Sequence, residues 1–252
     1  MKYYYLATYL PELAREDKKL RLRMADLLGD SGYLAPEDRR EVDLVLLAGD
    51  VLMVERLLAG HPLEVPLSLH ELDYWREQVK APADAPEFMA EVIKAAAGGQ
   101  FGPRQVDRLW AGYYDHVLAT AKNKLLRTYV AFERDVRNIQ AAVRARRQGL
   151  NLADHLVGES DLAALLGRSN AEDFGLAREY PWLDKLLAAK DPSRTRELME
   201  QVLWDFFEQN SGADPFAFDA ILAYLIKLAM VEKRLALDEN AGMELVRQLE
   251  EA

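Results

Sequence analysis

The stretch YVAFERDVRNIQAAVRARRQG, Tyr129–Gly149, decides the fold because it continues an apolar repeat with helical spacing. Steps of three and four residues make up this repeat, which is the period of a helix that buries one side. No proline lies between Arg104 and Tyr180, so nothing in that part of the sequence forces a helix to end. The pattern predicts one long spine helix over about 103–148. Its apolar positions are Leu118, Ala121, Leu125, Tyr129, Phe132, Val136, Ile139 and Val143.

The predicted length of this helix has a consequence for shape. At 1.5 Å per residue it would be about 65–70 Å long, more than the width of a compact domain of this size. We therefore expect an elongated molecule. Gly112 is the position at which we expect any bend of the helix.

The rest of the chain also favours helices. Asp191-Pro192 and Asp214-Pro215 each resemble an N-cap followed by proline in the first helical position. Few segments alternate apolar and polar residues, and hairpin signals are absent. The sequence predicts an all-α, elongated multi-helix bundle. Further helices are expected at about 11–29, 37–59, 69–80, 85–97, 151–157, 160–167, 180–189, 192–209, 215–237 and 240–251.

The segment GGQFGPR, residues 98–104, is a glycine- and proline-rich break before the spine helix. It predicts two parts. Residues 1–100 would form an N-terminal helical part, and residues 101–252 would hold the spine helix and a C-terminal helical part.

Composition excludes several function classes. The chain has 252 residues, of which 32 are basic and 42 acidic, and its net charge is -10. An acidic surface repels nucleic acid and anionic lipid, so we expect neither as a partner. The most apolar window, 44–54, is broken by Asp50 and is far shorter than the roughly 20 residues of a membrane span. Because cysteine is absent and the N-terminus is a poor signal peptide, we expect a soluble, cytoplasmic protein.

Six arginines between Arg127 and Arg147 form a basic cluster in this acidic chain. On the predicted helix, Arg134, Arg137 and Arg144 fall opposite the apolar side. Glu133 precedes Arg137 by four residues, which is the favourable order for an ion pair. The pattern favours a solvated helix face, with docking of an acidic partner as the alternative. Reversal of Arg137 and Arg144 to Glu is then expected to leave folding nearly intact.

Motifs for catalysis or metal binding do not stand out. The histidines are His61, His70, His116 and His155, and none belongs to a Glu-x-x-His or His-Glu-x-x-His motif. The glycines at 98, 99 and 102 lack the Lys-Ser/Thr of a phosphate loop. The sequence predicts no enzyme activity, no metal, no cofactor and no small-molecule substrate.

Three stretches together resemble a known family. They are KYYYLATYLPEL (2–13), the opening stretch (129–149) and DPFAFDAILAYLIKLAMVEKRLALDENAG (214–242). The second and third are similar to segments of the C-type central-stalk subunit of V/A-type rotary ATPases, whose eukaryotic counterpart is the d-type subunit. The first resembles an uncharacterised bacterial family associated with V-type ATPase subunits. The matching positions are Glu133, Asp135, Asn138, Ile139, Tyr224, Leu225, Glu232, Arg234 and Gly242.

The resemblance implies a role in ion transport, including proton transport, without catalysis by this chain. The C-type subunit is an adaptor that sits on the membrane ring of proteolipid subunits and receives the central stalk. The implied partners are the stalk and ring subunits, and the implied location is peripheral to the membrane through those subunits. The residues expected to contact partners are Glu133, Arg137, Asn138, Arg144, Tyr224 and Glu232.

Two alternatives stay open from the sequence. One is a helical scaffold or regulatory binding module that associates with itself through the heptad helix. The other is an enzyme whose active site lies between helices and carries no recognisable motif.

Overall fold

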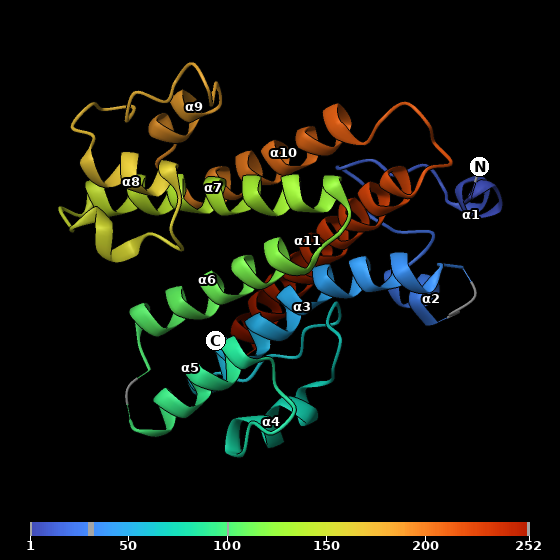
Figure 1. Ribbon diagram of the computed structural model, residues 1–252, viewed down its shortest axis with the longest axis horizontal. Helices are drawn as coiled ribbons and strands as arrows, with labels where there is room; N and C mark the ends of the chain where they lie inside the picture. The colour runs from blue at the N-terminus through green and yellow to red at the C-terminus, as the bar shows by residue number, and fades with distance from the viewer. Residues whose placement is uncertain (1, 30–32, 100, 251–252) are drawn as a thin grey trace. The chain divides into compact units, whose positions relative to one another are not determined.

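The computed structural model describes residues 2–29, 33–99 and 101–250, with side chains as far as Leu237. These ranges contain helices and no strand, so the predicted all-α class is confirmed (Figure 1). The helices are α1 (Tyr4–Tyr9), α2 (Met24–Gly29), α3 (Pro36–Leu58), α4 (Leu72–Lys80), α5 (Glu87–Ala97), α6 (Pro103–Thr120), α7 (Lys124–Arg147), the 3₁₀ turn η1 (Leu152–His155), α8 (Asp161–Arg168), α9 (Leu183–Ala188), α10 (Pro192–Asn210) and α11 (Phe218–Glu250).

The predicted spine helix is wrong, because the chain leaves the helical conformation at Ala121 and reverses direction before α7 (Figure 1). Asn123 is the N-cap of α7, and its side chain accepts a hydrogen bond from the Leu126 N–H at 2.8 Å. The buried carboxylate of Glu41 accepts the backbone N–H groups of Lys122 and Asn123 at 2.9 and 3.2 Å. Glu41 therefore stabilises the turn between α6 and α7, and Asn123 stabilises the start of α7. The length from which an elongated shape was predicted does not exist.

The chain divides into two compact units, Met1–Arg39 with Leu203–Ala252, called unit 1, and Arg40–Val202, called unit 2. The boundary predicted near residue 100 falls inside unit 2, between α5 and α6, which pack against each other. Gly112 lies inside α6, where a Cβ would be 2.6 Å from the Phe88 side chain of α5. Glycine at this position permits close approach of the two helices.

The core of unit 2 is built on α7, which contacts α6, η1 and α8. The predicted apolar side of α7 is confirmed, because Tyr129, Val136, Ile139 and Val143 are all buried. Close packing of such side chains is the main source of stability in a helical domain of this kind.

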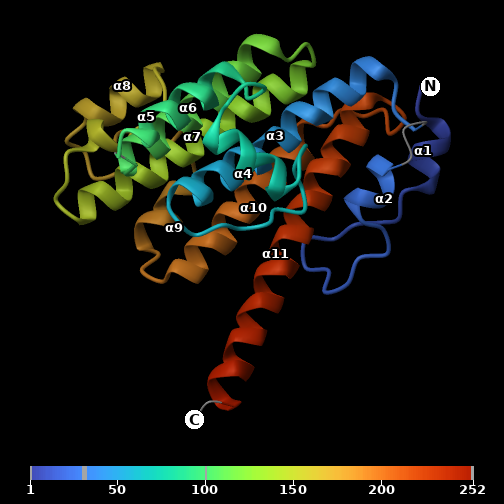
Figure 2. The same cartoon turned by 90° about the horizontal axis from the view of Figure 1, so that it is seen from below.

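Unit 1 combines the two ends of the chain. A single helix, α11, takes the place of the two predicted at 215–237 and 240–251, of which residue 251 lies outside the described residues. α2 packs on α11 (Figure 2). The helix predicted over 11–29 is also wrong, because residues 10–23 form a loop and only α2 is helical.

Candidate functional site

In the last turn of α7, Arg146 and Arg147 donate hydrogen bonds to backbone carbonyls of unit 2. The Arg146 guanidinium donates to the carbonyl oxygens of Ser169 at 2.8 Å, Glu172 at 3.1 Å and Ala171. It also lies over the ring of Phe174, with its central carbon 3.7 Å from the ring centroid. Phe174 is buried and has a positive φ of 57°, so Arg146 covers a strained turn.

Arg147 has an equivalent role one segment further on. Its guanidinium donates to the carbonyl oxygens of Leu186 at 3.0 Å and Leu187 at 2.8 Å, both in the last turn of α9. Carbonyls at a helix C-terminus have no partner within the helix, so a cation there is doubly favourable. The arginine-rich end of α7 thus attaches the 169–187 region to the core of unit 2.

The predicted solvated arginine face is wrong further up the helix as well. The Arg134 side chain is only 13% exposed and lies beside Asp135. The guanidinium carbon of Arg137 is 4.6 Å from the Trp110 ring centroid, and the Trp110 indole donates to the Glu55 carboxylate at 2.8 Å. A cation over an indole stabilises by about 0.5–2 kcal/mol. Reversal of Arg137 to Glu would remove this contact, so we expect it to cost some stability, which the helical pattern alone did not indicate.

Asn138, a predicted contact residue, is fully buried inside unit 2. Its amide nitrogen donates to the Val157 carbonyl at 3.0 Å, and its amide oxygen accepts the Val157 N–H at 2.7 Å. Both polar groups of Val157 are satisfied by one side chain. Asn138 joins α7 to the loop after η1 and is inaccessible to a partner.

The other predicted residues of α7 are more accessible. Arg144 is exposed, and Glu133 is half-buried close to the phenols of Tyr113, Tyr114 and Tyr129. Burial raises the pKa of each of these phenols well above its usual value, and the Glu133 charge raises it further. The phenols therefore stay protonated near neutral pH.

Tyr224 and Glu232, on α11, belong to unit 1, whereas the predicted contact residues of α7 belong to unit 2. The Glu232 carboxylate accepts the Met24 N–H at 2.6 Å, at the start of α2. Burial raises the pKa of Glu232, although the Met24 N–H and Arg23 oppose this effect. Burial, with a smaller effect of Asp17, raises the pKa of Tyr224 to about 12.

A buried acid that the sequence analysis did not select lies on α3. Asp50 is fully buried and accepts both the backbone N–H of His70 at 3.2 Å and its ring Nδ1 at 3.0 Å. The imidazole stacks on Tyr74, with ring centroids 4.1 Å apart. Burial raises the pKa of Asp50, and the hydrogen bonds from His70 lower it in part. The interruption of the apolar 44–54 window by Asp50 was the signal available in the sequence.

Gly49, next to Asp50, allows the loop of residues 67–70 to lie close to α3. A Cβ at Gly49 would be 2.0 Å from the Leu67 carbonyl oxygen, so no other residue fits there without displacing the backbone. Gly49 and Asp50 together hold residues 67–70 against the helix. Asp50 and Gly49 therefore fix the position of this loop on α3. Among the described residues, the His70 ring contacts Asp50, Tyr74 and Trp75, and none of these carries the nucleophilic hydroxyl or thiol of Ser, Thr or Cys.

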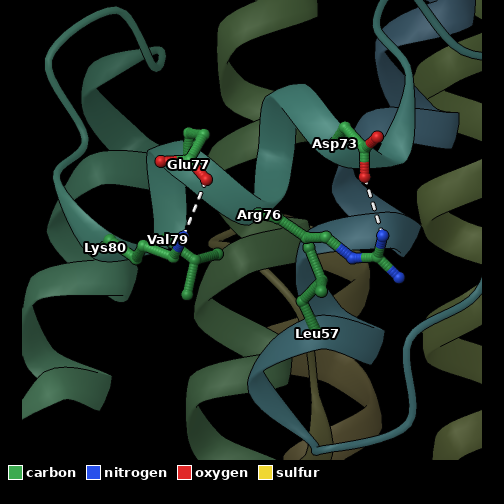
Figure 3. Close-up of a pocket in the computed structure, with 6 residues that line it drawn as sticks. All are labelled: Leu57, Asp73, Arg76, Glu77, Val79 and Lys80. Atoms are coloured by element: carbon green, nitrogen blue, oxygen red, sulfur yellow. Dashed lines mark hydrogen bonds and ion pairs between the residues drawn. The ribbon is translucent and has the colours of Figure 1, made fainter.

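An open hollow of about 590 Å³ lies between the end of α3 and α4 (Figure 3). Its charged lining residues pair with each other, Arg76 with Asp73 and Lys80 with Glu77, at 2.7 Å in both cases. Leu57 and Val79 complete the lining. The charged side chains of this hollow are therefore already paired with each other, and they are exposed to solvent.

Exposed aromatic rings gather on α1 in unit 1. Tyr5 is 87% exposed, Tyr9 59% and Tyr4 47%. In contrast, Tyr3 is buried, and its hydroxyl donates a hydrogen bond to Asp38 and accepts one from the Ala35 N–H. Tyrosine is enriched at protein interfaces because its large, rigid ring loses little entropy on binding. Of the aromatic groups described above, the exposed tyrosines of α1 are the strongest candidate for a surface that binds a partner.

Over the described part of the chain, no group of three metal-ligating side chains is found. The same part contains no helix long and apolar enough to cross a membrane.

These observations define an all-α protein in which two of the four predicted contact residues of α7, Arg137 and Asn138, make contacts inside unit 2. The family described as "Protein of unknown function (DUF2764)" matches over residues 1–252, and the chain belongs to this family. No curated protein matches the sequence.

Proposed function

We propose that this chain is a non-catalytic adaptor of the C type, linking the proteolipid ring of a V/A-type rotary ATPase to its central stalk. The observation that carries the proposal is the resemblance of two stretches to segments of the C-type subunit and of a third to a bacterial family associated with V-type ATPase subunits. The protein would act at the cytoplasmic side, peripheral to the membrane through its partner subunits.

The helices that carry the three stretches are consistent with such a role. The first includes α1 with its exposed tyrosines, the second covers most of α7, and the third leads into α11. An adaptor that transmits torque needs broad surfaces and stiff connections rather than reactive groups. Arg146, Arg147 and Asn138 supply such connections inside unit 2.

The alternative, a scaffold that associates through the heptad helix, requires an accessible apolar seam. That seam is α7, and its residues Tyr129, Val136, Ile139 and Val143 are buried. The structure therefore gives no support to this alternative, which size measurements of the purified protein would test directly.

The test of the adaptor function is an affinity pull-down of the tagged full chain from its own host, with mass spectrometry of the recovered proteins. We expect stalk and proteolipid-ring subunits in near-stoichiometric amounts, and none with the tag alone. Recovery of the chain alone, or only as a homodimer, would overturn the proposal.

A further inference from the structure

The loop between α1 and α2 carries a dense group of outward-facing cations in unit 1. Its sequence from Lys18 to Arg23 is KKLRLR. Lys18, Lys19, Arg21 and Arg23 are exposed, whereas Leu22 is buried and Leu20 is half-buried. The segment therefore turns its apolar side chains towards the protein and its basic side chains towards solvent.

This loop is held in place by α11. The Arg234 guanidinium donates to the carbonyl oxygens of Arg15 at 3.0 Å and Asp17 at 2.5 Å. Glu232 accepts the Met24 N–H at the other end of the basic segment. Figure 2 shows the loop passing beside α11 between α1 and α2. The segment is therefore fixed at both ends before any partner arrives.

Among the side chains that the structure describes, the cations of this segment are not neutralised by ion pairs. Within the described residues, none of Lys18, Lys19, Arg21 and Arg23 forms an ion pair, although Arg23 lies near Glu232. In contrast, Arg15 at the start of the loop pairs with Glu16 at 2.5 Å. A group of positive charges on a chain of net charge -10 is a local reversal of the overall sign. Such a patch steers and orients a negatively charged partner.

We propose that Lys18–Arg23 is a docking surface for an acidic helix of a partner protein. Six residues span at most about 20 Å, which is the length of three to four helical turns. Carboxylates at every third or fourth position of a helix lie on one face, about 5–6 Å apart along its axis, so several of them can face the segment together. This inference rests on the proposed adaptor function, because it assigns one of the surfaces through which the chain binds its ATPase subunits.

Other anionic partners fit the segment less well. No aromatic side chain is interleaved among the cations, as stacking on nucleic acid bases would require. Leu22 is buried and Leu20 is half-buried, so the segment exposes little apolar surface for insertion into a lipid surface. A protein surface that supplies carboxylates remains as the occupant.

The test compares three tagged full-length proteins in the same pull-down. One is the natural sequence and one combines Lys18→Glu, Lys19→Glu and Arg21→Glu, with Arg23 retained because it lies near Glu232. The matched control, Arg108→Glu, Lys190→Glu and Arg194→Glu, makes the same change in net charge at three other exposed positions. Circular dichroism confirms that all three are folded.

We expect the Lys18/Lys19/Arg21 variant to lose at least about tenfold of the recovered stalk or ring subunit, because like charges oppose each other at the interface. The control is expected to retain it. In the natural complex, a zero-length carbodiimide is expected to join Lys18 or Lys19 to an Asp or Glu of a helix in that subunit.

Equal recovery by the natural protein and the loop variant would overturn the docking surface and leave the adaptor function standing. Absence of stalk and ring subunits from the natural pull-down would overturn both. Binding of the purified protein to vesicles containing phosphatidylserine, lost in the loop variant, would make a membrane the occupant and also contradict the proposal.

Discussion

The C-terminal turn of α7 and the loop Lys18–Arg23 are both rich in positive charge, yet they use it in opposite ways. Arg146 and Arg147 point at backbone carbonyls of their own unit, where a helix end and a strained turn offer acceptors. The cations of the loop are exposed and form no ion pair within the described residues. Density of charge in a sequence therefore does not distinguish an internal brace from a surface for a partner; the backbone carbonyls within reach of each side chain do.

The largest effect on stability is expected from Asn138→Leu, on the internal side of this comparison. The change removes both hydrogen bonds to Val157 and leaves the backbone N–H and C=O of Val157 buried without these partners. We expect the free energy of unfolding to fall by about 2–4 kcal/mol. Urea denaturation followed by circular dichroism measures it. Gln140→Leu, at a half-buried position two residues on, is the control, and equal losses would show that the amide bridge is not responsible.

Arg146→Met tests whether the end of α7 is a brace. The methionine keeps apolar contact with Phe174 but loses three hydrogen bonds to carbonyl oxygens. We expect a loss of about 1–3 kcal/mol in unfolding free energy. The exposed Arg144, changed to Met, is expected to lose less than about 0.5 kcal/mol. If the two variants were equally stable, the internal role assigned to Arg146 would be wrong.

Asp50→Asn separates the charge of the buried acid from its hydrogen bonds. Asn retains an acceptor for the His70 N–H, so we expect a change of about 1 kcal/mol or less at pH 7. Because burial raises the folded-state pKa of Asp50 above the unfolded value, the native protein takes up this proton at higher pH than the unfolded chain does.

The sign of the pH effect follows. As pH falls from about 7 towards 4, natural protein is expected to gain stability relative to Asp50→Asn, because protonation removes the cost of a buried charge. Denaturation of both proteins at pH 7 and pH 5 checks this expectation. A relative loss at pH 5 would mean that the pair with a charged His70 outweighs burial.

The smallest effect belongs to the other side of the comparison. Lys18→Gln, Lys19→Gln and Arg21→Gln are each expected to change the unfolding free energy by less than about 0.5 kcal/mol, since the side chains are exposed. Thermal unfolding of the three variants measures it. A loss as large as that of Arg146→Met would place the loop cations among the internal braces and remove the contrast.

Local signals predicted those parts of the fold that local chemistry determines. The helix predicted at about 37–59 agrees with α3, and Asp191-Pro192 marked the start of α10 correctly, with the Asp191 side chain accepting the Ser193 N–H at 3.0 Å. Asp214-Pro215 did not mark a helix start, because Asp214 instead accepts the Phe216 N–H in a turn and α11 begins at Phe218. The apolar period of α7 was also correct, since it is determined by the side that packs on the core.

The errors come from contacts between distant residues. The break after α6 depends on Glu41, which is 81 and 82 positions from the N–H groups that it accepts. The loop 10–23 depends on Arg234, more than two hundred positions away. Neither partner can be identified by helical spacing. The candidate residues could be selected from the sequence, but only the structure distinguishes the buried Asn138 from the exposed Arg144.

The two chain segments of unit 1 impose an order on synthesis. Met24 and Glu232 are separated by 208 positions, and all of unit 2 lies between the two segments in the sequence. Unit 2 is continuous, so it can begin to fold while the ribosome is still translating the message. The N-terminal segment of unit 1 can complete its packing only after the last helix has been synthesised. Until then the α1 tyrosines, and leucines that are buried in the folded protein, are accessible to chaperones and to other chains. Ribosomes stalled before and after α11 would carry nascent chains that differ in the protease sensitivity of this N-terminal segment.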